Sequence, residues 1–312
     1  ETGEGLINLP AAVLVFLCAL LLVRGAKESA RLNAIMVVIK LGVLVLFIAI
    51  ALTAFNSDNM TPFAPHGFTG ISAAAGSIFF TFVGLDAVST AGEEVENPRR
   101  NLPLAIICAL LIVITFYVLV AFTAIGAQPP DQFEGQEAGL ALILQNITGS
   151  RIPAIVLAAG AVISVFSVTL IVLYGQTRIL FAMSRDGMLP PIFHRVDPRT
   201  MTPVANTFIV ATLVAMVAAF VPAAVLWDMT SMGTLIAFTV VSFGVILLRY
   251  RNPDAPRGFR VPFFPALPIL SICCCLYLIA NLSRIVFELT AIWGTLAAIF
   301  YFTYACLLYT SP

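Results

Sequence analysis

Charged side chains are scarce in this sequence. Aspartate, glutamate, lysine and arginine together make up 10% of the 312 residues, whereas hydrophobic residues make up 60% and the mean hydropathy is +1.03. A soluble domain carries roughly a quarter charged residues, so this chain cannot cover itself with polar surface and its solvent must be lipid. Acidic and basic residues balance to a net charge of zero, which argues against nucleic acid as a partner.

Residues that build catalytic and metal sites are also few. The two histidines, His66 and His194, lie in polar connecting stretches, and all six cysteines lie in apolar runs. The triplet Cys273–Cys275 lacks the spacing of a zinc or haem site, and cysteine in an apolar span usually behaves as a small hydrophobe. No HExxH, GxSxG or Walker A pattern occurs. The sequence therefore predicts no metal and no cofactor, and it disfavours an enzyme.

Long apolar runs dominate the chain instead. A helix needs roughly 17–25 apolar residues to cross a hydrocarbon core of about 30 Å. The sequence predicts an all-α integral membrane protein with about nine transmembrane helices, at residues 9–24, 34–55, 71–91, 103–127, 153–184, 205–221, 225–248, 266–283 and 289–309. A further apolar stretch within 128–152 is too short to cross, and we expect it to form an interfacial helix or a lid.

Basic residues are distributed unevenly between the connections. Successive connections between spans lie on opposite sides of the membrane. Fourteen of the sixteen basic residues lie in the connections of one side or in a span near that side, and only Arg151 and Arg284 lie in the connections of the other side. The positive-inside rule places the larger set in the cytoplasm. The sequence thus predicts a multi-pass protein of the inner or plasma membrane, with residue 1 outside and residue 312 in the cytoplasm.

The third predicted span contains polar residues where a membrane helix is expected to be apolar. Gly84 and Asp86 interrupt the stretch IFFTFVGLDAVSTAGEEVENP, and Ser77 precedes it. Irregular backbone at membrane depth is tolerated only where protein or water surrounds it. The residues therefore predict a helix broken at Gly84–Asp86, with Asp86 as the N-cap of its second half, as in secondary transporters. The alternative is an intact helix with Asp86 near the cytoplasmic boundary.

Lys40 is one of only two lysines in the chain and lies inside the second predicted span. It follows Ala34 by six residues, which corresponds to about 9 Å along a helix. It either snorkels back to the headgroups or is a buried ammonium that exchanges a proton during a transport cycle. The chain uses arginine at nearly every other position where a positive charge could anchor a helix end, and this contrast gives the second interpretation its weight.

Two further groups of polar residues are weaker candidates. Hydroxyl side chains within the fifth and seventh spans either line a cavity or bond back to their own helix; they are Ser164, Ser167, Thr169, Thr230, Ser231 and Thr234. The loop GEEVENPRRNLP, residues 92–103, is either a solvated connection or an inner gate whose carboxylates pair with Arg178 or Arg185.

Four stretches resemble conserved parts of one transporter family. They are GLDAVSTAGEEVENPRRNLP, GAKESARLNAIMVVIK, LYGQTRILFAMSRDGMLP and RNPDAPRGFRVPFFPALP. They are similar to the amino acid–polyamine–organocation superfamily, in particular its cationic amino acid transporter-like branch and the bacterial relatives of that branch. The four stretches occur in the family's order, and the resemblance covers nearly the whole chain.

The resemblance implies about twelve helices built on a five-plus-five inverted repeat. Residues 1–55 would form the last two helices of the first repeat, residues 56–248 the complete second repeat, and residues 249–312 two peripheral helices. The first three helices would then be missing, and the C-terminal CLLYTSP looks like sequencing-adapter read-through. On this basis we expect the chain to be a fragment of a longer permease.

The resemblance also implies substrate-binding residues on the broken span. The carbonyl groups of Phe80 and Val83 would receive the substrate ammonium. Gly84 and Leu85 would form the unwound turn, and Asp86 would begin the second half-helix.

Three further residues are assigned by the same resemblance. Lys40 matches a lysine that takes the place of a sodium ion in proton-driven members, and Ser167 matches a position near it. Val172 would face the substrate side chain. This apolar residue, together with Asp86 as the one acid placed well inside the predicted spans, favours neutral amino acids over arginine.

These implications together predict secondary active transport of amino acids by alternating access, with protons as the coupling ion and the lipid bilayer as the surroundings. The alternatives are an amino acid exchanger and a non-transporting membrane scaffold; binding of labelled amino acid would distinguish a transporter from the scaffold. An ion channel would instead carry currents that do not depend on amino acids. Without the first three helices, we expect the chain by itself to bind substrate poorly and to transport nothing.

Overall fold

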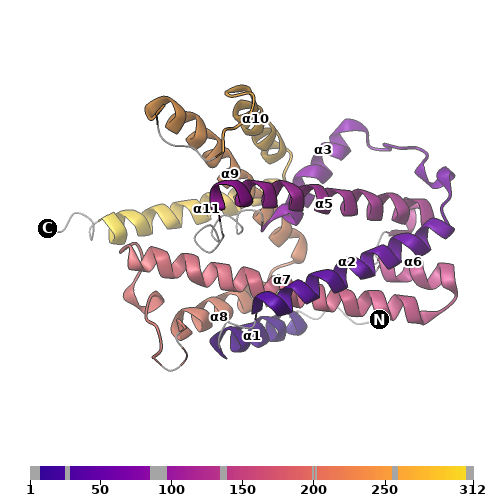
Figure 1. Cartoon of the computed structure of the whole chain (residues 1–312), viewed down its shortest axis with the longest axis horizontal. Coiled ribbons are helices and arrows are strands. Elements are labelled where there is room, and N and C mark those ends of the chain that lie inside the picture. The colour runs from indigo at the N-terminus through magenta and orange to yellow at the C-terminus, as the bar shows by residue number, and fades with distance from the viewer. Residues whose placement is uncertain are drawn as a thin grey trace. The chain divides into compact units, whose positions relative to one another are not determined.

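The computed structural model describes residues 8–24, 29–84, 97–133, 139–198, 200, 202–254 and 259–306. The α-helices are α1 (Leu9–Arg24), α2 (Ser29–Thr53), α3 (Gly67–Ser77), α5 (Pro98–Ala127), α6 (Gly139–Thr148), α7 (Arg151–Arg185), α8 (Val204–Phe220), α9 (Ala223–Arg251), α10 (Ala266–Ala280) and α11 (Arg284–Phe300). Short helical turns are η1 (Ser57–Met60), η2 (Ile78–Phe82), η4 (Pro130–Phe133), η5 (Pro191–Phe193) and η6 (Tyr301–Ala305). These described residues contain no strand, and the predicted all-α fold is confirmed (Figure 1).

Each of the nine predicted spans falls on a helix, but the helices differ in length. Five of those described are long and apolar enough to cross a membrane: α2 from Ala34 onward, α5, α7, α9, and α11 continued to Tyr304. The helices at the other four predicted spans are shorter and also apolar; they are Leu9–Val23, Gly67–Phe82, Val204–Phe220 and Ala266–Ala280. The stretch predicted as an interfacial helix or lid is helical and forms α6.

The sides of the spanning helices carry exposed apolar residues. At most 17% of the residues in the apolar window of any of the five long helices are buried within the protein. Val38 on α2, Leu111 on α5 and Val240 on α9 each expose at least 60% of their surface. Apolar surface of this extent on a water-soluble protein would drive aggregation, whereas in a bilayer it faces lipid tails. The chain is a multi-pass membrane protein.

The chain divides into two compact units, and α5 runs through the division. The first unit comprises residues 1–63 and 111–220, and the second comprises residues 64–110 and 221–312. This division follows packing and does not test the predicted assignment of repeats, which stays a prediction.

The first unit has two clusters of buried side chains. In one, α1 packs against α7 and α8 through Cys18, Ala19, Leu173 and Ala211. In the other, α2, α6 and α7 meet around a fully buried Phe47 and the buried Ile143 and Leu144 of α6, joined by Ala124 of α5. The contacts of α6 with α2 and α7 show that its apolar side is covered by these two helices.

The second unit is built around α9. This helix contacts α3, η2, α10 and α11. Its buried residues Met232 and Leu235 pack with Cys275 of α10 and Val286 of α11, and Phe79 of η2 covers the same cluster. The interrupted third span therefore lies directly against α9.

The close approach of α2 and α7 requires a glycine. A Cβ atom added to Gly160 of α7 would lie 2.9 Å from both Cγ atoms of Val43 on α2, closer than such carbon atoms pack. We expect Gly160→Ala to destabilise the chain by about 1–3 kcal/mol, as other overpacked cores do. The melting temperature of the detergent-solubilised chain measures this effect.

Gly175→Ala is the matched control, because it lies on the same helix and no atom of the described part of the chain lies within 4 Å of its added Cβ. The helix-propensity gain of alanine is common to both variants. Adding Val43→Ala to Gly160→Ala should restore part of the lost stability. Equal melting temperatures of the two single variants would contradict the close packing.

Candidate functional site

Within the described residues the helical backbone of the third span ends before Gly84, and the predicted break at Gly84–Asp86 lies partly outside them. The α-helical backbone of α3 ends at Ser77, and the tighter turns of η2 follow. Val83 is extended (φ −61°, ψ 136°), and Gly84 has a φ of +112°. L-residues with side chains rarely adopt such a φ, so glycine at this position has a structural reason.

The predicted continuation of the site, Leu85 and Asp86, lies outside the described residues. Of the two carbonyl groups predicted to receive an ammonium, that of Phe80 accepts a hydrogen bond from the Val83 amide at 3.0 Å. A carbonyl oxygen has two lone pairs, so this bond leaves acceptor capacity at Phe80. The roles of Phe80, Val83 and Gly84 in substrate binding stay predictions.

An acidic residue absent from the predicted site lies against the interruption. Asp228, on the second turn of α9, accepts a hydrogen bond from the Ser77 hydroxyl at 2.7 Å. The predicted span began at residue 225, which placed Asp228 near the end of the span rather than well inside it. Because an acid within an apolar span usually has a function, and Ser231 follows one turn later, the pair was a usable signal in the sequence.

Lys40 lies near the middle of α2. The helix begins at Ser29, five residues before the predicted start, so Lys40 is eleven residues, or about 16 Å, from its first residue. The side chain is half-buried. The part of the chain that the structure describes offers no hydrogen-bond or ion-pair partner to its ammonium group.

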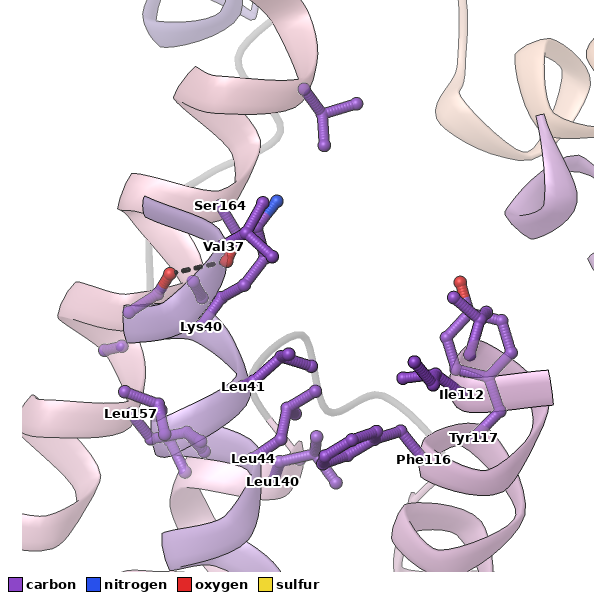
Figure 2. A pocket seen from close by; sticks show the side chains of 18 residues that line it. Val37, Lys40, Leu41, Leu44, Ile112, Phe116, Tyr117, Leu140, Leu157 and Ser164 are labelled. Atoms are coloured by element: carbon purple, nitrogen blue, oxygen red, sulfur yellow. Dashed lines mark hydrogen bonds between the residues drawn. The ribbon is translucent and has the colours of Figure 1, made fainter. Parts of the chain in front are cut away.

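Lys40 lines a largely apolar cavity of about 750 Å³ in the first unit. In Figure 2, Lys40, Leu41 and Leu44 of α2 lie on one side of the cavity and Ile112, Phe116 and Tyr117 of α5 lie on the other. The remaining lining comes from α2, α5, α6 and α7: Val37, Val43, Val113, Gly139, Leu140, Ala141, Leu157, Ala158, Gly160, Ala161, Ser164 and Val168. Among the described residues, the lining contains one cationic group and no carboxylate.

The candidate residues on α7 occupy different surroundings. Ser164 lines the cavity, and its hydroxyl donates to the Gly160 carbonyl at 2.8 Å (Figure 2). Ser167 is 1% exposed and Val172 is 50% exposed. Neither residue is part of the wall that the described residues form around this cavity. The predicted roles of Ser167 beside Lys40 and of Val172 beside the substrate stay predictions.

The hydroxyl residues of α9 divide into two kinds. Thr230 and Thr234 bond back to the carbonyl groups of Leu226 and Thr230 on their own helix, as expected for most such residues. Ser231 instead bonds to another segment, the end of α3. It is fully buried, so its hydroxyl is a fixed part of the second unit.

Of the residues predicted to form the inner gate, only the two arginines lie within the described residues. The guanidinium of Arg178 lies over the ring of Tyr174, 5.2 Å from its centre. Arg185 is 3.8 Å from the carboxylate of Asp186, and both side chains are largely exposed. The candidate partners Glu93, Glu94 and Glu96 lie outside the described residues, so the gate stays a prediction.

Comparisons with known proteins place these features in a family. The family model of amino acid permeases matches residues 5–306. The chain is 42% identical over 300 residues to the branched-chain amino acid permease BcaP of Bacillus subtilis and 38% identical over 299 residues to the methylthioribose transporter of the same organism. Each of these alignments covers 96% of this chain and 64% of the relative.

More distant similarity extends to eukaryotes. The chain is 32% identical over 252 residues to the human cationic amino acid transporter 4, an alignment covering 80% of this chain and 39% of the relative. The chain spans about two thirds, 64%, of the length of the two Bacillus relatives. The match of the family model over nearly all residues decides the assignment, and the chain belongs to the amino acid permease family.

Proposed function

We propose that this chain is part of a secondary transporter that moves neutral amino acids with apolar side chains across the cell membrane. The observation that carries this proposal is the cavity beside Lys40. Its aliphatic and aromatic walls suit an apolar side chain, and its volume of about 750 Å³ lies in the range of small-molecule sites.

The charges around the cavity define what the substrate should not carry. A cationic side chain would enter a site whose described lining contains an ammonium and no carboxylate. Leaving a guanidinium unpaired there costs about 3 kcal/mol or more, which corresponds to a discrimination on the order of a hundredfold. The branched-chain permease among the relatives supports this class, and the cationic amino acid transporters do not exclude it.

The interrupted span, which belongs to the second unit, is a further segment that we propose contacts an amino acid substrate. The Phe80 carbonyl, which keeps acceptor capacity beside its bond to the Val83 amide, and the Val83 carbonyl would receive the substrate ammonium. Lys40 would lose and regain a proton during the cycle and so couple transport to the proton gradient. Alternating access would be oriented with residue 1 outside and residue 312 in the cytoplasm.

We expect uptake of isoleucine when this chain replaces the matching 64% of the Bacillus subtilis branched-chain permease. Cells lacking their own branched-chain transport would express the chimera, and labelled isoleucine would be competed with leucine, arginine and methylthioribose. Leucine should compete on the order of a hundredfold better than arginine, because arginine would bury an unpaired charge.

The choice of competitors separates the alternatives. Methylthioribose carries neither an ammonium nor a carboxylate, so strong competition by it alone would assign the chain to a different substrate class. A chimera that reaches the membrane in a folded form and binds none of the three compounds would favour a scaffold. Either result would overturn the proposal.

A further inference from the structure

One face of α9 makes every described polar contact between this helix and the interruption of the third span. Asp228 and Ser231 are three residues apart, so they lie on the same side of the helix. Both bond to Ser77, the last residue of α3. All of these residues belong to the second unit.

The hydroxyl of Ser231 occupies a place within the backbone hydrogen bonding of the span. It donates to the Ser77 carbonyl at 3.0 Å and accepts from the Phe80 amide at 2.9 Å. These two backbone groups are three residues apart and are the pair that a single 3-10 turn would join directly. A side chain inserted into the ladder is a recognised cause of helix interruption. Ser231 thus bridges the end of α3 and the start of η2, where the backbone changes from α-helical to 3-10 turns.

The carboxylate of Asp228 joins three helices. Its Oδ1 accepts from the Ser77 hydroxyl at 2.7 Å, and its Oδ2 accepts from the Ser283 hydroxyl at 2.8 Å. Ser283 immediately precedes α11 and makes no capping bond with its own helix. A carboxylate in an apolar span is costly unless it is hydrogen-bonded, and two hydroxyl donors meet that requirement. Asp228 therefore fixes the end of α3 and the start of α11 to α9.

An aromatic contact completes this face. The rings of Trp227 and Phe80 are stacked, with centres 5.6 Å apart and planes 5° apart. Phe80 is thus held through its ring by Trp227 and through its amide by Ser231. The carbonyl of Phe80 is a candidate substrate ligand, and α9 therefore fixes the residue that carries it.

We propose that Trp227, Asp228 and Ser231 are positioning residues that set the conformation of the interrupted span. They act through the backbone at Ser77 and Phe80, and they contribute hydrogen bonds and stacking rather than a charge that changes during the cycle. This inference goes beyond the proposed function, because it concerns how the interruption is maintained whether or not amino acids are the substrate.

Substitutions at Asp228 separate positioning from a charge-based role. An asparagine keeps an oxygen that accepts from one serine, and its amide can donate to the hydroxyl oxygen of the other. Asp228→Asn should therefore preserve the conformation, whereas Asp228→Ala should not. A carboxylate that carried a proton or a cation would instead fail equally in both variants.

Hydrogen exchange of the purified chain in lipid nanodiscs tests the proposal directly. We expect the Phe80 amide to exchange about tenfold faster in Ser231→Ala, because one hydrogen bond of roughly 1–1.5 kcal/mol is lost. Asp228→Ala should accelerate exchange across residues 77–82, and Asp228→Asn should match the wild type. Unchanged exchange at Phe80 in folded Ser231→Ala, or equal loss in the two Asp228 variants, would overturn the proposal.

Two substitutions on α9 serve as controls. Thr230→Ala removes a neighbouring hydroxyl that bonds only within α9 among the described contacts, and Ser242→Ala removes a serine that bonds to Ser271 of α10. Neither should change exchange at Phe80. If Asp228→Ala does not fold, Ser77→Ala removes a single one of its hydrogen bonds and should still accelerate exchange at Phe80; no acceleration would count against the proposal.

Transport by the chimera gives a second, independent readout. Asp228→Ala should raise KM for isoleucine about tenfold, as expected for a lost hydrogen bond that orders a binding segment, and leave the accumulation ratio unchanged. A residue needed only for folding would lower the maximal rate at unchanged KM, and that result would overturn the assignment as a positioning residue. Should the chimera prove inactive, the hydrogen-exchange result still decides, so failure of the proposed function and failure of this inference remain distinguishable.

Discussion

Lys40→Ala is expected to abolish proton-driven accumulation of isoleucine in the permease chimera. With one proton per substrate, a gradient of one pH unit supports about tenfold accumulation, because about 1.4 kcal/mol corresponds to a factor of ten. In the variant the accumulation ratio should fall to one, while isoleucine still equilibrates across the membrane. Uptake into vesicles with an imposed pH gradient measures both quantities.

The physical reason lies in where Lys40 is placed. It is half-buried near the middle of α2, and it lines a cavity with aliphatic and aromatic walls. No carboxylate among the described residues offsets its charge there. An ammonium in such surroundings is costly, and release of its proton removes the cost. Alanine has no proton to release, so substrate movement would no longer be linked to the gradient.

Two further variants separate proton exchange from simple anchoring. Lys27→Ala removes the only other lysine of the chain and should leave accumulation intact. Lys40→Arg keeps the positive charge but cannot lose its proton at accessible pH, so it should also abolish accumulation. If Lys40→Arg accumulated isoleucine normally, the residue would be an anchor whose charge reaches the headgroups, and the proposed coupling role would be wrong.

The sequence was sufficient to predict the helices because hydropathy is a local property. The predicted span 153–184 corresponds to α7 at Arg151–Arg185, and the predicted span 205–221 to α8 at Val204–Phe220. At α2 the prediction began at residue 34, whereas the helix begins at Ser29. The additional turn contains Arg31 and Asn33, polar residues that continue a helix without adding to its hydropathy.

The interruption of the third span could be predicted only in part. Gly84 signalled irregular backbone, and its φ of +112° confirms that reading. The earlier end of α3 at Ser77 depends on Ser231 and Asp228, which are more than 150 residues further along the chain. A contact of this kind has no local signature, so the pattern around Ser77 could not reveal it.

The cavity could not be predicted from the sequence. Lys40 and Ser164 were recognisable as polar residues in apolar spans, but their common cavity depends on how α2 packs against α7. That packing rests on Gly160 accepting the side chain of Val43, a complementarity between distant residues. Residue type identified the candidates, and tertiary packing decided which of them line the cavity.

Gly84→Ala is expected to weaken isoleucine uptake by the chimera through KM. An L-residue held at a φ of +112° costs about 1–3 kcal/mol, which corresponds to a five- to hundredfold loss of affinity if the native conformation is required for binding. No atom of the described residues lies within 4 Å of the added Cβ, so the expected penalty is that of the backbone conformation. The concentration dependence of initial uptake rates measures it.

Gly244→Ala on α9 is the matched control for this variant. Its added Cβ also has no neighbour within 4 Å among the residues that the structure describes, and its backbone is helical, so alanine should be neutral or stabilise the chain by about 0.5–1 kcal/mol. The pair thus compares one added methyl group in a strained and in a relaxed backbone.

The result for Gly84 also decides how the interrupted span participates in binding. If KM rises while Gly244→Ala is unaffected, the unusual backbone at residues 83–84 is needed to present its carbonyl groups to the substrate. If KM is unchanged and the variant is folded, the chain can rearrange at Gly84 without cost to binding. The substrate ammonium would then have to be held by groups other than the carbonyls of Phe80 and Val83, because those groups depend on the turn that Gly84 permits.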